Sequence, residues 1–311
     1  MKTKKFHLFM QLLCLFIQTG LSAKPKIIGL IQARNESAII AQCLKALALY
    51  TDSIVYLDDV STDNTLEIVK SLSEECNIEK IITKDTWYRN ANFDRNKLLQ
   101  TGRELGGTHF IVIDADEMFT ANCLKNNMLK KRILALKPGE KLKLNWIQLW
   151  KSLDYYRFDD SVWTNNYKDF IFCDDKKCFY ERTFIHIRRT PENLTGKVRT
   201  IEGYEYGMMH FQFVNWKNLL IKGAWYRCLE RIRLPEKSDE EINRRYAPRT
   251  NEKNLGLKAA SSFWFKGYNF FNPTVFNIPD SWRKKQVLQW FKEYGQDHFA
   301  GLDIWNIDWS A

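Results

Sequence analysis

The strongest constraint in this sequence is a regular alternation, between residues 26 and 114, of short apolar runs and segments with helical periodicity. The apolar runs, each followed by polar residues, lie at residues 26–32, 53–57, 78–83 and 109–113. In the first intervening segment, residues 36–50, apolar side chains recur at the three- and four-residue spacing of one helix face. Strands that alternate with helices in this way favour a parallel sheet covered on both faces. We therefore predict an α/β fold with a Rossmann-like, mostly parallel sheet flanked by helices.

Polar clusters follow three of the predicted strands. The first strand is followed by ARNE, the second ends in Asp58 and Asp59, and the fourth runs into the sequence DADE, residues 114–117. Ligands of parallel sheets bind beyond the carboxyl ends of the strands. The three clusters are therefore expected to form one site.

Asp114 and Asp116 are candidates to hold a divalent cation. Carboxylates this close together repel one another, and a bound cation turns that repulsion into attraction. Mg²⁺ and Mn²⁺ prefer oxygen ligands and are commonly held by one or two carboxylates together with substrate phosphates. We therefore predict that both aspartates bind Mn²⁺ or Mg²⁺ beside a diphosphate. The alternative is a solvated turn between a strand and a helix, with Glu117 near the helix start.

A set of motifs in this order resembles the inverting glycosyltransferases of family 2, which have the GT-A fold. The motifs are IIGLIQARNESAIIAQCLKAL, VYLDDVSTDNTLEIV, DRNKLL and FIVIDADE, and the resemblance covers about residues 26–120. It implies a metal-assisted single displacement from a nucleotide-diphosphate sugar donor, expected to be UDP-linked. The implied acceptor is a hydroxyl group of a glycan or a glycolipid.

The resemblance also implies roles for individual residues. It assigns the nucleotide to the end of the first strand and to the second aspartate of the Asp-Asp pair. The implied nucleotide-binding residues are Gln32, Arg34, Glu36, Asp59, Arg95 and Asp114. Asp58 is expected to orient its loop rather than to contact the nucleotide. Two positions depart from the family pattern, because Val60 replaces a small residue and Arg34 replaces a frequent aromatic residue.

His210 completes the set of predicted metal ligands. It lies within the apolar and aromatic run YEYGMMHFQFVNW. The resemblance implies its role, because some GT-A enzymes supply a late histidine as an extra metal ligand, and imidazole suits Mn²⁺. The alternative is a core histidine that is satisfied by a backbone carbonyl. His186 is a weaker candidate for the acceptor or diphosphate pocket.

Inverting transfer needs a general base that takes the proton of the acceptor hydroxyl group. In the GT-A fold this carboxylate follows the D-x-D segment. The candidates for this catalytic role are Asp154, Asp159, Asp160 and Glu181, and the sequence does not choose among them. A solvated loop is the alternative for Asp159 and Asp160.

The first 23 residues have the features of a signal peptide or an uncleaved signal anchor. Basic residues precede an apolar stretch from Leu8 to about Leu21, which suits a signal-peptide core better than a full membrane span. We therefore expect an exported, lumenal or membrane-associated protein, and the alternative is the cytoplasmic face of a membrane. In an oxidising compartment, Cys173 and Cys178 could form a disulfide across a hairpin.

The rest of the chain is predicted to divide into a GT-A catalytic domain, residues 25–214, and a helical, aromatic-rich C-terminal region, residues 215–311. Apolar residues at helical spacing favour packing of this region on the catalytic domain, and peripheral contact with a membrane is the alternative. Gln289 stands where processive synthases have the arginine of Q-x-x-R-W, so we expect addition of a single sugar.

The net charge and the motifs limit the classes of binding partner that the sequence favours. The net charge of +10 favours an anionic partner, and no arginine-rich tract, zinc-finger spacing or RNA-binding motif indicates nucleic acid. Two other functions remain as alternatives. One is a degenerate, non-catalytic protein that binds sugars or nucleotides. The other is a sugar nucleotidyltransferase, although ARNES lacks the glycine-rich loop of that class.

Overall fold

The computed structural model describes residues 24–88, 90–181, 188–279 and 281–310. The predicted signal peptide or anchor, residues 1–23, and His186 lie outside the described residues. Within the described ranges, no helix combines the length and the apolar character that crossing a membrane requires.

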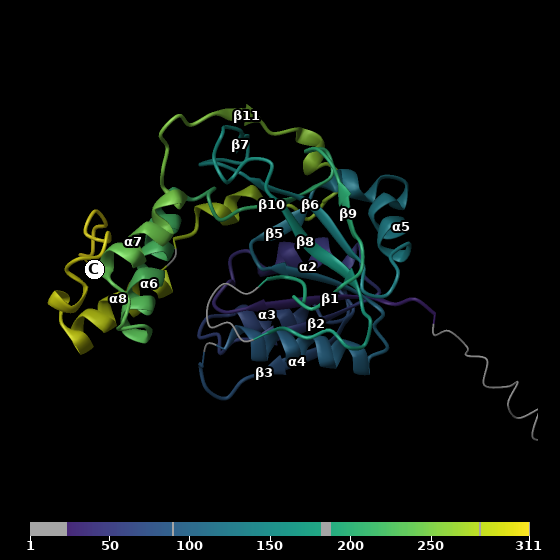
Figure 1. The fold of residues 1–311 in the computed structure, drawn as a ribbon, viewed down its shortest axis with the longest axis horizontal. Coiled ribbons are helices and arrows are strands. Elements are labelled where there is room, and N and C mark those ends of the chain that lie inside the picture. Colours follow the sequence, from purple (N-terminus) through teal and green to yellow (C-terminus); the bar gives the residue numbers. More distant parts are fainter. Residues whose placement is uncertain (1–23, 89, 182–187, 280, 311) are drawn as a thin grey trace, which may run out of the picture.

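Strands in the described part of the chain form two sheets (Figure 1). They are β1 (Ile27–Ala33), β2 (Ser53–Asp58), β3 (Ile78–Thr83), β4 (His109–Asp114), β5 (Glu117–Phe119), β6 (Lys141–Gln148), β7 (Tyr155–Arg157), β8 (Tyr167–Cys173), β9 (Val198–Ile201), β10 (Gly207–His210) and β11 (Leu257–Ala259). The large sheet has the order β3-β2-β1-β4-β8-β6-β10-β5, with β9 paired to β6, and β7 pairs with β11 in a small second sheet. The predicted first four strands are present and pair in parallel. The predicted α/β fold, with a mostly parallel sheet flanked by helices, is confirmed.

The register of the parallel strands sets the place of the site. Ala33 of β1 lies opposite Asp58 of β2, and Gln32 of β1 lies opposite Asp114 of β4. The ends of three strands therefore meet at one edge of the sheet, as the sequence predicts. Beyond β4 the sheet becomes mixed, because β8 runs antiparallel to both β4 and β6.

Helices cover both faces of the sheet. The α-helices are α2 (Ile40–Ala48), α3 (Thr65–Ser71), α4 (Ala91–Glu104), α5 (Met128–Leu134), α6 (Trp216–Arg233), α7 (Asp239–Tyr246) and α8 (Ser281–Tyr294). Short 3₁₀ segments are η1 (Ala121–Asn127), η2 (Ala247–Arg249), η3 (Ser262–Trp264), η4 (Pro273–Asn277) and η5 (Gln296–Phe299). Apolar residues of α2, α3 and α5 join one core cluster, and those of α4 join the cluster on the opposite face.

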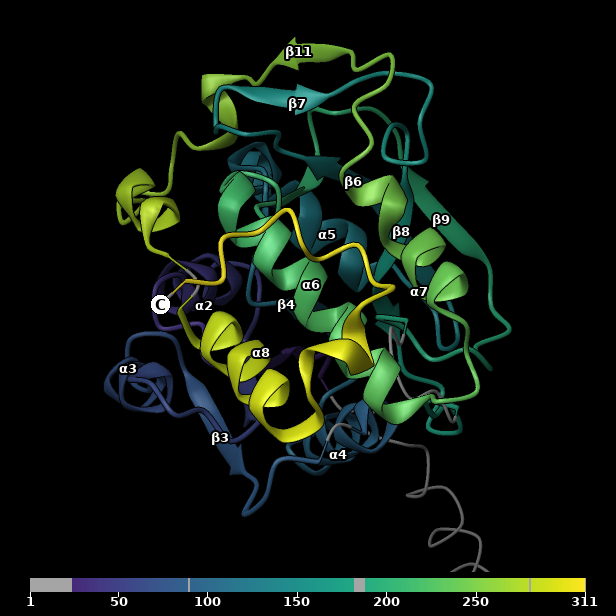
Figure 2. The ribbon, with the colours of Figure 1, turned by 90° about the vertical axis from the view of Figure 1, so that its left-hand side faces the viewer.

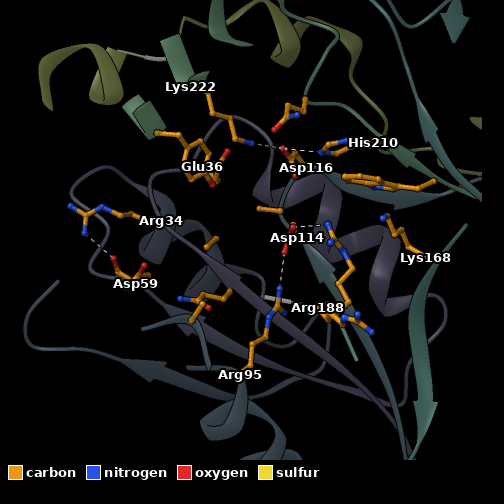
Figure 3. Close-up of a pocket in the computed structure, with 18 of the residues that line it drawn as sticks. Arg34, Glu36, Asp59, Arg95, Asp114, Asp116, Lys168, Arg188, His210 and Lys222 are labelled. Carbon is orange, nitrogen blue, oxygen red and sulfur yellow. Dashed lines mark hydrogen bonds and ion pairs between the residues drawn. The ribbon is translucent and has the colours of Figure 1, made fainter. Parts of the chain in front are cut away.

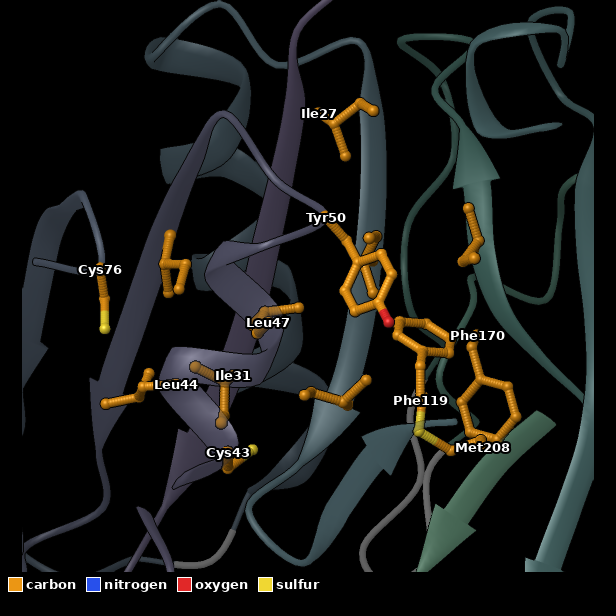
Figure 4. Packing of buried hydrophobic residues seen from close by; sticks show 14 of the residues in the cluster. Ile27, Ile31, Cys43, Leu44, Leu47, Tyr50, Cys76, Phe119, Phe170 and Met208 are labelled. Carbon is orange, nitrogen blue, oxygen red and sulfur yellow. The ribbon is translucent and has the colours of Figure 1, made fainter. Parts of the chain in front are cut away.

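The packing of α2 on β1 is close enough to require a glycine (Figure 4). A Cβ atom at Gly29 would lie 2.7 Å from Cδ2 of Leu47. Leu47 is 1% exposed and belongs to the same apolar cluster as Ile31 and Leu44. This contact fixes the helix against the strand whose carboxyl end carries Gln32.

The C-terminal part of the chain is helical and rich in aromatic residues, as predicted. Figure 2 shows α6, α7 and α8 grouped together, and their buried side chains form a separate apolar cluster. Trp225 of α6 is central to it, with ring contacts to Trp282 and Trp290 of α8. The division of the chain at residue 214 stays a prediction.

Cys173 and Cys178 are free and buried in this structure. The disulfide that the sequence allows is therefore not formed. The sulfur of Cys178 lies instead 3.3 Å from the carboxylate of Asp174 and 3.3 Å from Nη2 of Arg103. Cys178 therefore contacts the polar groups of Asp174 and Arg103 where a disulfide would have placed the second sulfur.

We expect Leu47→Ala to lower the free energy of unfolding by about 2–5 kcal/mol, because it leaves a cavity between α2 and β1. The matched control is Leu49→Ala, since Leu49 is 47% exposed just after the same helix. Its effect should stay within about 0.5 kcal/mol. Urea unfolding followed by circular dichroism measures both variants, and equal destabilisation would contradict the packing described here.

Candidate functional site

A cavity of about 970 Å³ opens at the edge where the parallel strands end (Figure 3). Strands β1, β4 and β8 and the loop after β2 contribute to its wall, together with residues of α4, α6 and α8. It is lined by every residue predicted to bind nucleotide or metal, namely Gln32, Arg34, Glu36, Asp59, Arg95, Asp114, Asp116 and His210. The structure thus brings these residues together from segments far apart in the sequence.

Asp114 is held between two guanidinium groups. Its Oδ1 accepts a hydrogen bond from Arg95 at 2.8 Å, and its Oδ2 accepts one from Arg189 at 2.6 Å. Burial alone would raise the pKa of Asp114, but Arg189 and Arg95 outweigh burial and lower it. The carboxylate is therefore ionised at neutral pH and faces the cavity as an anion.

Glu117 is a structural anchor of this edge. It belongs to β5, is fully buried, and accepts hydrogen bonds from the Asp114 amide at 2.9 Å and from Nε1 of Trp146 at 2.8 Å. Arg189 also pairs with this carboxylate. The alternative interpretation, a solvated turn with Glu117 near a helix start, is therefore wrong. Glu117 was the carboxylate of the cluster to which the sequence assigned no role.

Asp116 faces one ammonium group and one imidazole. Nζ of Lys222, on α6, lies 2.9 Å from Oδ2 of Asp116, and Nε2 of His210 lies 3.6 Å from the same oxygen. Burial would raise the pKa of Asp116, but Lys222 and His210 together lower it well below its usual range. Asp116 is therefore a carboxylate poised to bind a cation.

A hydrogen bond to Gln148 fixes the orientation of the His210 imidazole. Nδ1 of His210 lies 2.7 Å from Oε1 of Gln148, whose own Nε2 donates to the backbone carbonyl of Trp146 at 2.8 Å. The Gln148 oxygen can only accept, so Nδ1 of the imidazole carries a proton and Nε2 faces Asp116. The indole of Trp146 stacks on the imidazole, with ring centroids 4.3 Å apart. This arrangement is typical of metal-binding histidines.

The cavity fits a divalent cation at this point. Asp116 and His210 offer an oxygen and a nitrogen, 3.6 Å apart, that face the same part of the cavity. One carboxylate and one imidazole suit Mn²⁺, with further positions left for water and phosphate oxygens. Asp114 already has its charge balanced by two arginines and lies further from this pair.

A second group of polar residues lies beside the ends of β1 and β2. Nζ of Lys84 lies 2.5 Å from Oδ1 of Asp59 and 3.0 Å from Oδ2 of Asp94. Gln32 donates to the same Asp94 oxygen at 2.8 Å. This network holds Asp59 and Gln32 at the cavity wall.

Arg34 lies among aromatic residues that the sequence does not connect to it. Its guanidinium lies 4.6 Å from the ring of Trp87 and 5.6 Å from that of Trp282, and its Nη1 donates to the backbone carbonyl of Asp59. Glu36 pairs with Arg283 of α8 at 3.0 Å. The C-terminal helices therefore complete the wall of the cavity.

The loop after β2 has the conformation that the Asp-Asp pair predicts. Asp58 is buried and accepts a hydrogen bond from the Ser61 amide at 2.8 Å, so it orients the loop, as expected. Val60 has a positive φ of 60°, which is costly for a β-branched residue. The small residue usual at this position would relieve that strain.

The four carboxylates predicted as general bases do not line the cavity. Asp159 pairs with Arg157 at 2.7 Å and accepts the Ser161 amide, while Asp154, Asp160 and Glu181 are exposed. This placement corrects the prediction from the sequence. The reason is that β7 pairs with β11 in the separate small sheet, which takes residues 154–160 away from the strand ends.

Asp169, on β8, is the carboxylate that the cavity wall offers instead. It faces Lys141 at 3.6 Å and Lys143 at 3.7 Å, and its Oδ1 is buried without a hydrogen bond to another described residue. The sequence gave Asp169 no distinguishing signal, because it lies inside a strand without a motif. Other contributors that sequence reasoning missed are Lys84, Asp94, Gln148, Arg189, Lys222 and Arg283.

Solved structures with some similarity include TarS of S. aureus, at 14% identity and a TM-score of 0.43. The similarity covers 89% of this chain, which spans about half (49%) of the TarS chain. Another is the mannosyltransferase PcManGT of Pyrobaculum calidifontis, solved with GDP-Man and Mn²⁺, at 19% identity and a TM-score of 0.31. That similarity covers 46% of this chain and 43% of the other. No curated protein matches the sequence.

The family comparison is specific to the part of the chain that builds the site. Residues 30–130 match the family model described as glycosyl transferase family 2. This range contains Asp59, Asp114 and Asp116, and it includes most of β1 together with β2, β3 and β4. The part of the chain that builds the site is therefore similar to the glycosyltransferases of family 2.

Proposed function

We propose that this enzyme moves one sugar from a UDP-linked donor to a hydroxyl group of a glycan or glycolipid acceptor, with inversion and with the help of Mn²⁺ or Mg²⁺. The observation that carries the proposal is the convergence of Asp59, Asp114, Asp116 and His210 on one cavity of about 970 Å³. Location outside the cytoplasm, or at a membrane surface, remains part of the proposal.

The nucleoside would lie beside β1 and β2. A carboxylate can accept the imide N–H of uracil, and Asp59 is held at the cavity wall by Lys84 for that role. Asp114 would accept hydrogen bonds from the ribose hydroxyl groups, because both of its oxygens are fixed by arginines. The base and the ribose would thus be recognised by carboxylates of fixed orientation.

The diphosphate would lie at Asp116. Asp116 and His210 would hold the cation, which would supply charge that stabilises the departing diphosphate. Lys222 now balances the charge of Asp116. When a metal takes over that carboxylate, the ammonium group is close enough to bind a phosphate oxygen. Arg283 lies on the same wall of the cavity.

The acceptor would approach from the side of β6 and β8. Its hydroxyl oxygen attacks the anomeric carbon of the donor from the face opposite the diphosphate, and the bond to the diphosphate breaks. The proton of the hydroxyl group would pass to Asp169, whose buried Oδ1 has no other hydrogen bond among the described residues. The single displacement accounts for inversion.

We expect Asp116→Asn to reduce metal-dependent sugar transfer, or hydrolysis of the UDP-sugar, by at least about 100-fold, because the metal loses its charged ligand. Asp297→Asn is the matched control, since Asp297 is exposed and does not line the cavity. A screen of UDP-sugars with and without Mn²⁺ measures both. Full activity of Asp116→Asn, or activity in excess EDTA, would overturn the metal assignment. Binding of UDP-sugar without any turnover would instead favour the non-catalytic alternative.

Gln148→Leu should weaken Mn²⁺ binding by about 10- to 100-fold, because nothing then holds the proton of His210 on Nδ1. Gln148→Glu keeps an acceptor at that place and should retain most of the affinity. Calorimetric titration of Mn²⁺ in the presence of UDP compares them, and melting temperatures control for the fold. Equal loss in both variants would mean that Gln148 only packs.

Asp169→Asn should lower the rate of transfer by about 10²- to 10⁴-fold, the range for loss of a general base, and leave UDP binding unchanged. Asp160→Asn tests the corrected prediction at the same time, since Asp160 is exposed and should have no effect. Rates with a responsive acceptor and UDP affinities by calorimetry separate the two. The assignment fails if Asp160→Asn is the slower variant.

A further inference from the structure

A second cavity, of about 460 Å³, is lined by residues of α6, the end of α7 and the C-terminal segment. Its wall includes Arg227, Arg249, Tyr246, Asn251 and Trp305. None of these residues belongs to a motif of the sequence. The proposed function, as argued above, uses none of them.

Arg227 is a buried cation that has no ion-pair partner among the described residues. It is 7% exposed, its Nε is buried without a hydrogen bond, and it makes no ion pair with any other residue in the described ranges. Its guanidinium lies 5.4 Å from the ring of Tyr246, which is a weak substitute for an anion. Burial lowers the pKa of Arg227, and Asp303 at the cavity wall opposes that effect. A charge buried in this way is costly unless something pairs with it.

The surroundings of Arg249 resemble those of Arg227. Its guanidinium lies 4.8 Å from the same Tyr246 ring, and its Nη1 is buried without a hydrogen bond to another described residue. Arg249 lines both the second cavity and the large cavity. Two guanidinium groups therefore line one small space, and one of them also lines the large cavity.

The remaining wall suits a sugar. The indole of Trp305 is 44% exposed and is stacked on Phe291, with ring centroids 5.4 Å apart, so it presents a fixed apolar face. Asn251 and Asn306 add amide groups that can donate and accept hydrogen bonds to hydroxyl groups. An aromatic face with amides and cations matches a ring that carries both hydroxyl groups and a negative charge.

We propose that the second cavity binds an anionic carbohydrate, with its phosphate or carboxylate group between Arg227 and Arg249 and its ring against Trp305. As a statement about the acceptor, this rests on the proposed function: the acceptor is then an anionic glycan whose charged portion lies here, while its reacting hydroxyl group lies at Asp169. The shared wall at Arg249 provides the continuity between the two positions.

The test measures direct binding to the full chain without nucleotide, so it does not depend on catalysis. Glucose 6-phosphate and glucuronate are titrated by calorimetry, with glucose as the neutral probe. Binding of both charged sugars, and not of glucose, is expected, and the stronger of the two identifies phosphate or carboxylate as the preferred anion. Arg227→Met should weaken the charged sugars at least tenfold, since it removes a charge-assisted hydrogen-bond donor.

Two control variants locate the site. Lys222→Met alters the large cavity only, and Arg132→Met alters an exposed arginine of α5 that lines neither cavity. Both should bind the charged sugars like the parent chain. Arg227→Met is expected to fold at least as stably as the parent, because it removes an unpaired buried charge. Should it fail to fold, Trp305→Ala takes its place and should also weaken binding.

Equal affinity for glucose and its charged relatives would overturn the proposal, and so would a loss of binding in Lys222→Met rather than in Arg227→Met. Failure of the transferase proposal has a different signature. It would appear as an absence of sugar transfer and of UDP-sugar hydrolysis in the parent chain, while the binding of charged sugars at Arg227 stayed intact.

Discussion

The edge of the sheet that builds the site depends on one guanidinium group. Arg189 lies between Asp114 and Glu117, and so joins the carboxylate at the end of β4 to the buried carboxylate of β5. Without it, two acids would lie at one buried strand end, and one would have to be protonated or the strand end would have to open. Glu117 in turn holds the Asp114 amide and the Trp146 indole. The backbone of the D-x-D segment and the wall behind His210 are thus fixed by the same charge pair.

Asp116 is stabilised differently, and the difference suits a role in turnover. Its partner Lys222 comes from α6, in the C-terminal region, on a flexible side chain that can move without disturbing the sheet. Asp114 is held by two rigid guanidinium groups, and Asp116 by one ammonium group and an oriented imidazole. Under the proposed function, a cation that arrives with a diphosphate would displace Lys222 at Asp116 while Asp114 stays in place. The fixed carboxylate would then position the donor, and the exchangeable one would hold the metal.

The parts predicted well from the sequence are those specified by neighbours in the chain. The first four strands follow from apolar runs and helical spacing, and their register brings Gln32 and Asp114 together without further information. The pairing of charges is not local. Arg189 and Lys222 lie 75 and 106 residues beyond the aspartates they neutralise, and nothing in their own segments marks them. The prediction of Asp159 as a general base failed for the opposite reason. Its carboxylate is already paired with Arg157, only two residues away in the sequence.

The net charge of +10 can likewise be related to how charges are paired in the two cavities. In the large cavity Arg95, Arg189, Lys222 and Arg283 are already paired with carboxylates, so a donor diphosphate must compete for these four cations. In the second cavity Arg227 and Arg249 lie against the ring of Tyr246 and make no ion pair within the described part of the chain. Positive charge left unpaired in a buried place persists only where its cost is offset, and a structural role would be met more cheaply by a neutral side chain of the same shape. The two arginines are therefore better explained by a ligand than by the fold, and Arg249 ties that ligand to the site of transfer.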